Sequence, residues 1–404
     1  MRITPLLLLL IASSSFFAQT TITHLTIDSK YIKETRTLNI TLPNGYQNSV
    51  KQYPLVLILD DGLLFNTTSA IVNQLSSTSR MPESIVVSLS ASEKHRNYFA
   101  PNLYNNHRGR RYHYGNHQEA FINFLEFEVI PLIEKAFRIA NFRMFIGFSP
   151  SSAIGLHTLL LQPNLFQAYI CFAAGNIIGD GYHKDERLIE ALATVYSQAG
   201  IEQSYLYVVS GDKDAVTQPY INTNIKDFNE KLSKFNTSSI HTKAETITGE
   251  GHTDVVLPGL ITAFDFIFPK EEWIVDYRDL IEKEGAAKEN ITAFYQKLSD
   301  VYGFPIYPTV NRLYSMSCLK NIGRQLLRNN KVEEAIAIYE YWVTLYPLSH
   351  LAHYHLGLAF QEHQDHKNAI TAFEKAYSLA LQQERKASSI YKQAIDNLRH
   401  SNNN

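Results

Sequence analysis

Residues 145–152 read Phe-Ile-Gly-Phe-Ser-Pro-Ser-Ser, and this stretch carries the main prediction about the fold. An apolar strand pattern runs into Gly147, whose missing Cβ allows a sharp backbone turn. Ser149 follows the turn and a helical pattern begins immediately after it. A nucleophilic serine needs such an exposed, strained position, but serine is also a common helix N-cap. The turn alone therefore leaves both interpretations open.

Strand and helix patterns alternate around this stretch. After alternating Thr- and Ile-rich segments over 20–42, apolar strand patterns occupy residues 53–59, 84–89, 142–146, 166–174 and 205–210. Helical patterns occupy residues 118–137, 151–162 and 257–267. Continuous apolar strands that alternate with helices are typical of a mostly parallel sheet covered on both faces. The sequence predicts an α/β domain over residues 19–270.

Polar side chains follow two later segments of this domain. Gly211-Asp212-Lys213-Asp214 comes directly after a strand pattern, and His252 lies in a Gly-rich loop before an apolar helix. Ligand chemistry in an open α/β sheet takes place beyond the carboxyl ends of the strands. Serine, acid and histidine in this order can form a catalytic triad. Taken singly, the aspartates also fit ordinary turns and the histidine an ordinary surface loop.

The ordered set of motifs resembles the esterase branch of the α/β hydrolases, the group that includes enterobactin and bacillibactin esterases. The motifs that carry the resemblance are Glu34-Thr-Arg36, Leu42-Pro-Asn-Gly-Tyr46, residues 53–62, 121–137 and 145–149, Gln162-Pro-Asn-Leu-Phe166 and Gly251-His252. The resemblance implies the α/β-hydrolase fold and hydrolysis of a small-molecule carboxylic ester, with no cofactor and no metal. It implies Ser149 as nucleophile, His252 as base and an acid in the loop 211–214. We favour Asp214 over Asp212, because Gly-x-x-Asp is frequent for the acid in this fold.

Pro150 departs from the family pattern. One oxyanion donor of this fold is the backbone N–H of the residue after the nucleophile, and proline has none. Losing one such donor raises the barrier by about 2.7–4 kcal/mol. The other donor is expected from the backbone of Gly62 or Leu63. Three outcomes stay open: a side chain such as that of Ser151 replaces the missing donor, the enzyme is slow, or the domain binds without turnover.

An arginine- and tyrosine-rich segment separates the strand 84–89 from the helix 118–137. The resemblance implies that this segment overhangs the active site. We expect it to bind substrate through Arg96, Arg108, Arg110, Arg111 and Tyr112. Arginine pairs with anions and stacks on aromatic rings, so an anionic or aromatic acyl group, such as that of a siderophore ester, would fit. A solvated basic loop is the alternative.

Beyond Phe268-Pro269 only helical patterns follow, and they contain a repeat. Four positions recur after 34 residues in the same order: Gly323, Ala335, Tyr339 and Trp342 match Gly357, Ala369, Phe373 and Ala376. This period is typical of tetratricopeptide (TPR) repeats. We expect a helical linker over 271–315, TPR-like repeats over 316–398 that bind a protein partner, and a disordered tail at 399–404. An unrelated helical bundle is the alternative.

The first eighteen residues have the pattern of a secretory signal peptide. Arg2 precedes an apolar run at residues 6–12, and the small residue Ala18 precedes the polar Gln19. The run is shorter than the ~20 residues that a membrane span needs. We expect residues 1–18 to be removed and the protein to be secreted or periplasmic, without a membrane span. An N-terminal core segment is the alternative.

The amino-acid composition narrows the classes of protein to which the chain can belong. The chain of 404 residues is 45% hydrophobic and 19% charged, as globular proteins are, and its formal net charge of −2 gives no indication of a nucleic-acid partner. Its two cysteines, Cys171 and Cys318, are expected to be buried free thiols.

The leading hypothesis is a serine esterase. A catalytically silent, hydrolase-like ligand-binding or scaffold protein is the alternative, and transfer of the acyl group to another alcohol is a third.

Overall fold

The computed structural model describes residues 22–90, 96–198, 200–312 and 315–401. The predicted signal peptide lies outside the described residues. In the described part of the chain, no helix is long and apolar enough to cross a membrane.

An eight-stranded sheet forms the centre of the molecule, in the order β1-β2-β4-β3-β7-β8-β9-β10. Its strands are β1 (Ile22–Asp28), β2 (Thr35–Thr41), β3 (Tyr53–Ile58), β4 (Ile85–Leu89), β7 (Ile139–Phe148), β8 (Ala168–Phe172), β9 (Ser204–Gly211) and β10 (Ile240–Ile247). Strand β2 pairs antiparallel with β1 and β4, and all other neighbours are parallel. This arrangement confirms the predicted α/β-hydrolase fold.

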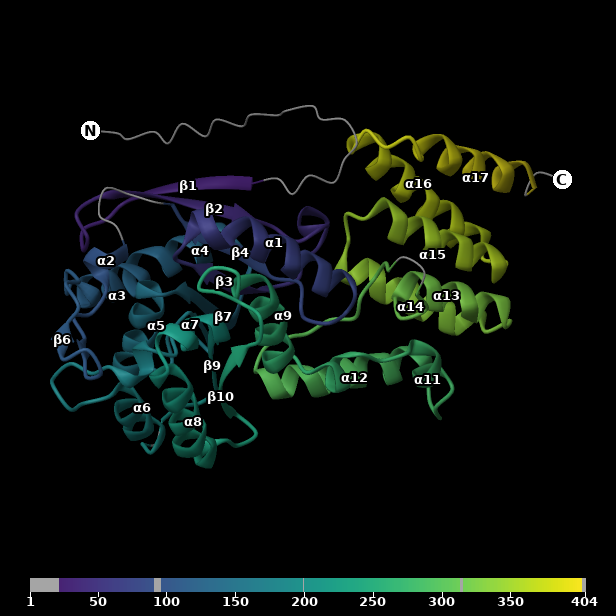
Figure 1. Ribbon diagram of the computed structural model, residues 1–404. Coiled ribbons are helices and arrows are strands. Elements are labelled where there is room, and N and C mark those ends of the chain that lie inside the picture. Colours follow the sequence, from purple (N-terminus) through teal and green to yellow (C-terminus); the bar gives the residue numbers. More distant parts are fainter. Residues whose placement is uncertain (1–21, 91–95, 199, 313–314, 402–404) are drawn as a thin grey trace, which may run out of the picture.

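Helices cover both faces of the sheet (Figure 1). Alternate side chains of β3 enter two hydrophobic clusters, since Leu55 and Leu57 pack on one face and Val56 and Ile58 on the other. One face is covered by α5 (Pro150–Leu161), α6 (Leu188–Tyr196), α8 (Tyr220–Leu232) and the segment 118–136, and the other by α1 (Asp61–Ser77) and α9 (Val256–Ile267). Burial on both faces explains why these strands read as unbroken apolar runs.

The single helix expected over 118–137 is instead three pieces. The helices α3 (Gln118–Phe124) and α4 (Ile130–Ala136) are joined by a π-helical turn at Leu125–Val129. Pro131 has no N–H for the regular helical hydrogen bond and its ring clashes with the preceding turn. The π-helical turn accommodates the proline without interrupting the apolar stripe.

The C-terminal region is all-helical. It contains α10 (Lys270–Trp273), α11 (Tyr277–Ile281), α12 (Ala287–Tyr302), α13 (Leu319–Arg328), α14 (Val332–Leu345), α15 (His350–Glu362), α16 (His366–Gln382) and α17 (Ser388–Ser401). A Cβ on Gly323 would lie 2.5 Å from the Tyr339 ring, and one on Gly357 would lie 2.6 Å from the Phe373 ring. The repeated glycines are thus places where an aromatic ring of the next helix meets the backbone. Helix α17 extends three residues into the tail that we expected to be disordered.

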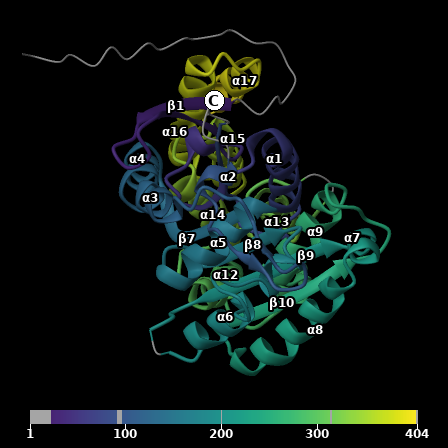
Figure 2. The ribbon, with the colours of Figure 1, turned by 60° about the vertical axis from the view of Figure 1, so that its left-hand side comes forward.

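The helical region and the α/β region share one hydrophobic core. The cluster under α1 and α9 continues without a break into α10 to α15. In Figure 2, the helices α13 and α15 appear next to α1. The ring of Phe142 on β7 lies 5.3 Å from that of Phe304 and 6.0 Å from that of Tyr302. The C-terminal helices therefore act as a cover for one face of the sheet.

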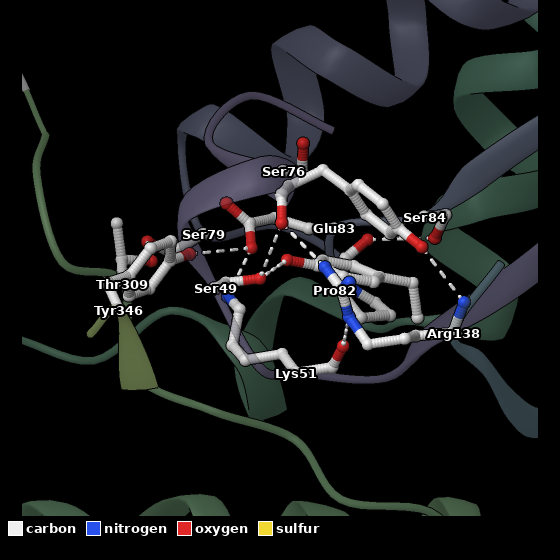
Figure 3. Close-up of polar contacts among 12 residues, drawn as sticks. Ser49, Lys51, Ser76, Ser79, Pro82, Glu83, Ser84, Arg138, Thr309 and Tyr346 are labelled. Carbon is white, nitrogen blue, oxygen red and sulfur yellow. Dashed lines mark hydrogen bonds and ion pairs between the residues drawn. The ribbon is translucent and has the colours of Figure 1, made fainter. Parts of the chain in front are cut away.

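A partly buried ion pair lies at the junction of the two regions (Figure 3). The Lys51 side chain is only 6% exposed and pairs with Glu83. Tyr346, at the end of α14, places its ring 4.8 Å from the Lys51 ammonium and donates its hydroxyl to Glu83 at 3.2 Å. Ser79 and Thr309 join the two regions by a further hydrogen bond of 2.7 Å. Polar and apolar contacts together fix the C-terminal helices on the sheet.

Deletion of residues 271–404 should abolish soluble expression, because it would expose Phe142 and the apolar face around it to water. Deletion of residues 388–404 is the matched control: α17 packs mainly in small separate clusters with α15 and α16, so this variant should remain soluble. Soluble yield and thermal melting of the two deletion variants test these two expectations. A cooperatively melting monomer of residues 22–270 would contradict the shared core.

Candidate active site

Ser149 occupies a strained turn between β7 and α5. Its φ is +56° and its ψ is −115°, a backbone conformation that is rare outside glycine. Its N–H donates to the Phe172 carbonyl oxygen at 2.9 Å. A Cβ on Gly147 would lie 2.7 Å from the Ser151 carbonyl, so only glycine fits there. Residues 145–152 therefore form a sharp, strained strand-to-helix turn, the backbone geometry that is expected of a nucleophile elbow.

His252 and Asp214 are brought together beside this elbow. Asp214 lies in α7 (Asp212–Thr217), directly after β9, and His252 lies in the loop between β10 and α9. The His252 Nδ1 is 2.8 Å from the Asp214 Oδ2. The His252 ring also lies 5.1 Å, edge to face, from that of Phe148, the residue before Ser149. A carboxylate on Nδ1 leaves Nε2 free to accept a proton.

Asp212, the alternative acid, has another partner. Its carboxylate accepts the Gly249 backbone N–H at 2.9 Å and so fixes the loop that carries His252. The geometry therefore favours Asp214 as the residue that orients the base. The Asp214 side chain is 17% exposed, and that of His252 is 48% exposed.

The two candidate oxyanion residues lie at the start of α1. The Leu63 N–H already donates to the Asp60 carbonyl oxygen at 3.2 Å. Around Gly62, a Cβ would meet no atom within 4 Å, so the backbone there borders open space. These two facts make the Gly62 N–H the stronger candidate of the pair.

Ser151 does not suit the role of a replacement donor. Its side chain is fully buried, and its hydroxyl makes no hydrogen bond of ordinary geometry. It faces Asp60, where burial raises the pKa of the carboxyl and the Ser151 hydroxyl is one of several groups that partly offset this rise. A hydroxyl enclosed in this way is turned toward the protein interior, away from a substrate at Ser149.

The predicted substrate-binding side chains divide into two sets. Arg96, in α2 (Arg96–Phe99), pairs with Asp60 and lies 5.4 Å from the Phe148 ring centre. Arg108, Arg110 and Arg111 are exposed on or beside a small hairpin of β5 (Tyr104–Asn105) and β6 (Arg110–Arg111). The structure therefore keeps Arg96 at the elbow and the other three arginines at the surface.

Tyr112 belongs to a buried polar cluster beneath the hairpin. Its hydroxyl accepts hydrogen bonds from the side-chain amides of Asn105 at 3.2 Å and Asn176 at 3.4 Å. Its ring stacks on that of Tyr114 at 5.2 Å. Substrate binding by these arginines and Tyr112 stays a prediction.

Asp180, which the sequence analysis missed, lies in this cluster. Its side chain is fully buried, and burial raises its pKa to about 8, although Asn105 and Tyr112 partly offset the effect. In the sequence, Gly179-Asp180-Gly181 looks like an ordinary surface turn, so no local signal identifies a buried acid.

Replacing Asp180 by Asn should change how stability depends on pH. Because the folded-state pKa lies above the ordinary value of 3.8, the folded protein binds the proton more tightly. The stabilisation that this tighter proton binding gives the folded protein is complete below about pH 4 and is lost as the pH rises toward 8. Asp180→Asn should therefore match wild type near pH 4.5 and be more stable at pH 9, by on the order of a few kcal/mol. Urea unfolding at both pH values measures the difference.

The exposed Asp185→Asn in the same loop is the control for this experiment, and it should follow wild type at both pH values. An equal loss of stability between pH 4.5 and pH 9 in wild type and Asp180→Asn would contradict the assignment.

Many solved structures match this chain, among them the following three. An IroE-like serine hydrolase from Shewanella oneidensis is 20% identical with a TM-score of 0.62, and the match covers 79% of this chain and 98% of that one. An uncharacterised protein from Capnocytophaga ochracea is 16% identical with a TM-score of 0.55, with 94% and 100% covered. The siderophore hydrolase EstA from Aspergillus nidulans is 16% identical with a TM-score of 0.50, with 63% and 98% covered.

The match to the Capnocytophaga protein extends over the C-terminal helices as well as the sheet, since it spans nearly the whole chain. A search of the curated proteins finds no match. The family described as "Putative esterase" matches residues 29–252, more than half of the chain. The chain therefore belongs to this family and is a carboxylic ester hydrolase.

Proposed function

We propose that this protein hydrolyses its ester through an acyl-enzyme formed on Ser149. The observation that carries the proposal is the hydrogen bond between Asp214 and His252 beside the strained turn of Ser149. His252 Nε2 takes the Ser149 proton as Oγ attacks the ester carbonyl carbon. The tetrahedral intermediate collapses, and His252 returns the proton to the departing alcohol. Water then attacks the acyl-enzyme by the same route, which releases the acid and frees Ser149.

The developing oxyanion is bound by fewer backbone donors than is usual in this fold. Pro150 offers no N–H, so the Gly62 N–H at the start of α1 is the donor that we assign. An enzyme with one such donor is slower by a factor of about a hundred to a thousand than one with two. We infer a slow esterase.

The substrate we propose has an anionic or aromatic acyl group, as a siderophore ester has. Arg108, Arg110 and Arg111 present cationic, forked donors on the hairpin, and Tyr112 and Tyr114 present stacked rings beneath them. Such side chains suit carboxylates, catecholates and aromatic rings. The siderophore hydrolase among the structures of similar fold supports this class of substrate.

For the rest of the chain we propose secretion or export to the periplasm, on the pattern of residues 1–18. We also propose that the hairpins α13–α14 and α15–α16 are TPR-like units. Their repeated glycine–aromatic contacts support this assignment, and a protein partner would bind the surface that they leave free.

Pro150 also favours a second candidate function, a hydrolase-like protein that binds an ester without turning it over. The two candidates differ in whether Ser149 is reactive. A fluorophosphonate probe should label Ser149 in wild type, and Ser149→Ala should lose both labelling and hydrolysis of p-nitrophenyl butyrate. Ser77→Ala, an exposed serine in α1, is the control and should behave as wild type. Absence of labelling in a folded wild type would favour the silent protein.

Replacing Pro150 by glycine restores a backbone N–H after the nucleophile. We therefore expect Pro150→Gly to keep or raise kcat on the same ester, by up to about a thousandfold. Steady-state kinetics measure the change. A large fall in kcat in a folded variant would mean that the proline is needed to shape the elbow.

A further inference from the structure

Asp60 is the residue at which the parts of the site meet. It follows β3 at the carboxyl edge of the sheet, and its side chain is only 4% exposed. One carboxylate oxygen, Oδ2, accepts the Phe148 N–H at 2.9 Å, and the other pairs with Arg96. Its backbone carbonyl oxygen accepts the N–H groups of Leu63 and Leu64 at 3.2 and 2.9 Å. One residue thus contacts the elbow, the start of α1 and the start of the arginine-rich segment.

The contact with Phe148 continues the sheet beyond the point where backbone pairing ends. The last backbone hydrogen bond between the two strands runs from the Leu59 N–H to the Ile146 carbonyl oxygen at 3.2 Å. After it, the β3 chain turns away into α1 and the β7 chain turns into the elbow. The Asp60 carboxylate accepts a hydrogen bond from the buried Phe148 N–H. Without this acceptor the N–H would be unpaired, and a buried unpaired N–H is destabilising.

The charge of Asp60 is balanced by Arg96. Burial raises the pKa of Asp60, while Arg96 and the Phe148 N–H lower it in part. The neighbouring Asp61 is occupied elsewhere, since it accepts hydrogen bonds from Asn39 on β2 and Ser88 on β4. The start of α1, which carries Gly62, is therefore fixed on one side to β2 and β4 and on the other to the elbow.

We propose that Asp60 is a positioning residue of the ester-hydrolysing site, which sets the distance between Ser149 and the Gly62 donor by binding Phe148 and Arg96 with one carboxylate. The inference rests on the proposed function. Pro150 leaves the Gly62 N–H as the single assigned backbone donor. If that donor is displaced, no second donor can compensate for it.

Two substitutions separate the roles of the carboxylate. Asp60→Asn keeps an oxygen for the Phe148 N–H but loses the charge that pairs with Arg96, whereas Asp60→Leu loses both. Displacing reacting groups by about 1 Å can cost a hundredfold in rate, so we expect kcat on p-nitrophenyl butyrate to fall about a hundredfold in Asp60→Leu and less in Asp60→Asn. KM should change little, because the carboxylate does not touch the substrate.

A double substitution tests the pairing with Arg96. In Asp60→Asn the Arg96 charge loses its partner, and Asp60→Asn/Arg96→Gln removes that charge. We expect the double variant to recover part of the kcat that Asp60→Asn loses. Glu83→Gln, which breaks a partly buried ion pair at the junction with the C-terminal helices, is the matched control; it should lower stability and leave kcat unchanged.

Hydrogen exchange gives a readout that does not depend on turnover. The Phe148 amide should exchange faster in Asp60→Leu than in wild type, and Asp60→Asn should stay close to wild type. If wild type neither turns over esters nor reacts at Ser149, the proposed function fails, but this measurement still tests the geometry. Should Asp60→Leu not fold, Asp60→Asn and the double variant carry the kinetic test. A folded Asp60→Leu with kcat within about twofold of wild type, or with unchanged exchange at Phe148, would overturn the proposal.

Discussion

The turn at Ser149 is the constraint on which the rest of the site depends. It holds a non-glycine residue at positive φ. Three neighbours keep it there. Gly147 has no Cβ, and one could not fit there; the Phe172 carbonyl oxygen accepts the Ser149 N–H; and the Asp60 carboxylate accepts the Phe148 N–H. Such a strained residue persists only where the surroundings over-determine it. The parallel strands on either side bring the acid and the base to the same edge of the sheet, as the fold requires.

The second constraint is the core that both regions share. Phe142 on β7, the strand that ends at Ser149, is covered by Tyr302 and Phe304 from the C-terminal region. The helices are thus part of the packing that supports β7 and the turn at Ser149. The Lys51–Glu83 pair helps to hold them in one position, since the buried Lys51 charge would be destabilising without its partner.

Much of the fold could be predicted from the sequence, because buried parallel strands are unbroken apolar runs. Ser149 and Asp214 follow two of these runs, and His252 comes shortly before an apolar helix. The edge strand β10 was missed, since it is half-exposed and its apolar and polar residues are mixed. The pairing of Arg96 with Asp60 joins residues far apart in the chain, and Asp180 is buried by a hairpin that leaves no local pattern. Contacts of this kind depend on tertiary packing and have no periodic signature.

The most direct test of the account is to trap the acyl-enzyme. Wild type would be mixed with a slowly deacylating activated ester, quenched in acid and digested, and the peptide that contains Ser149 would be weighed by mass spectrometry. We expect one added acyl group on Ser149, absent from Ser149→Ala and retained longer in His252→Ala if any forms there. Ester turnover by wild type with no acyl group on Ser149, or with the acyl group on another residue, would contradict it.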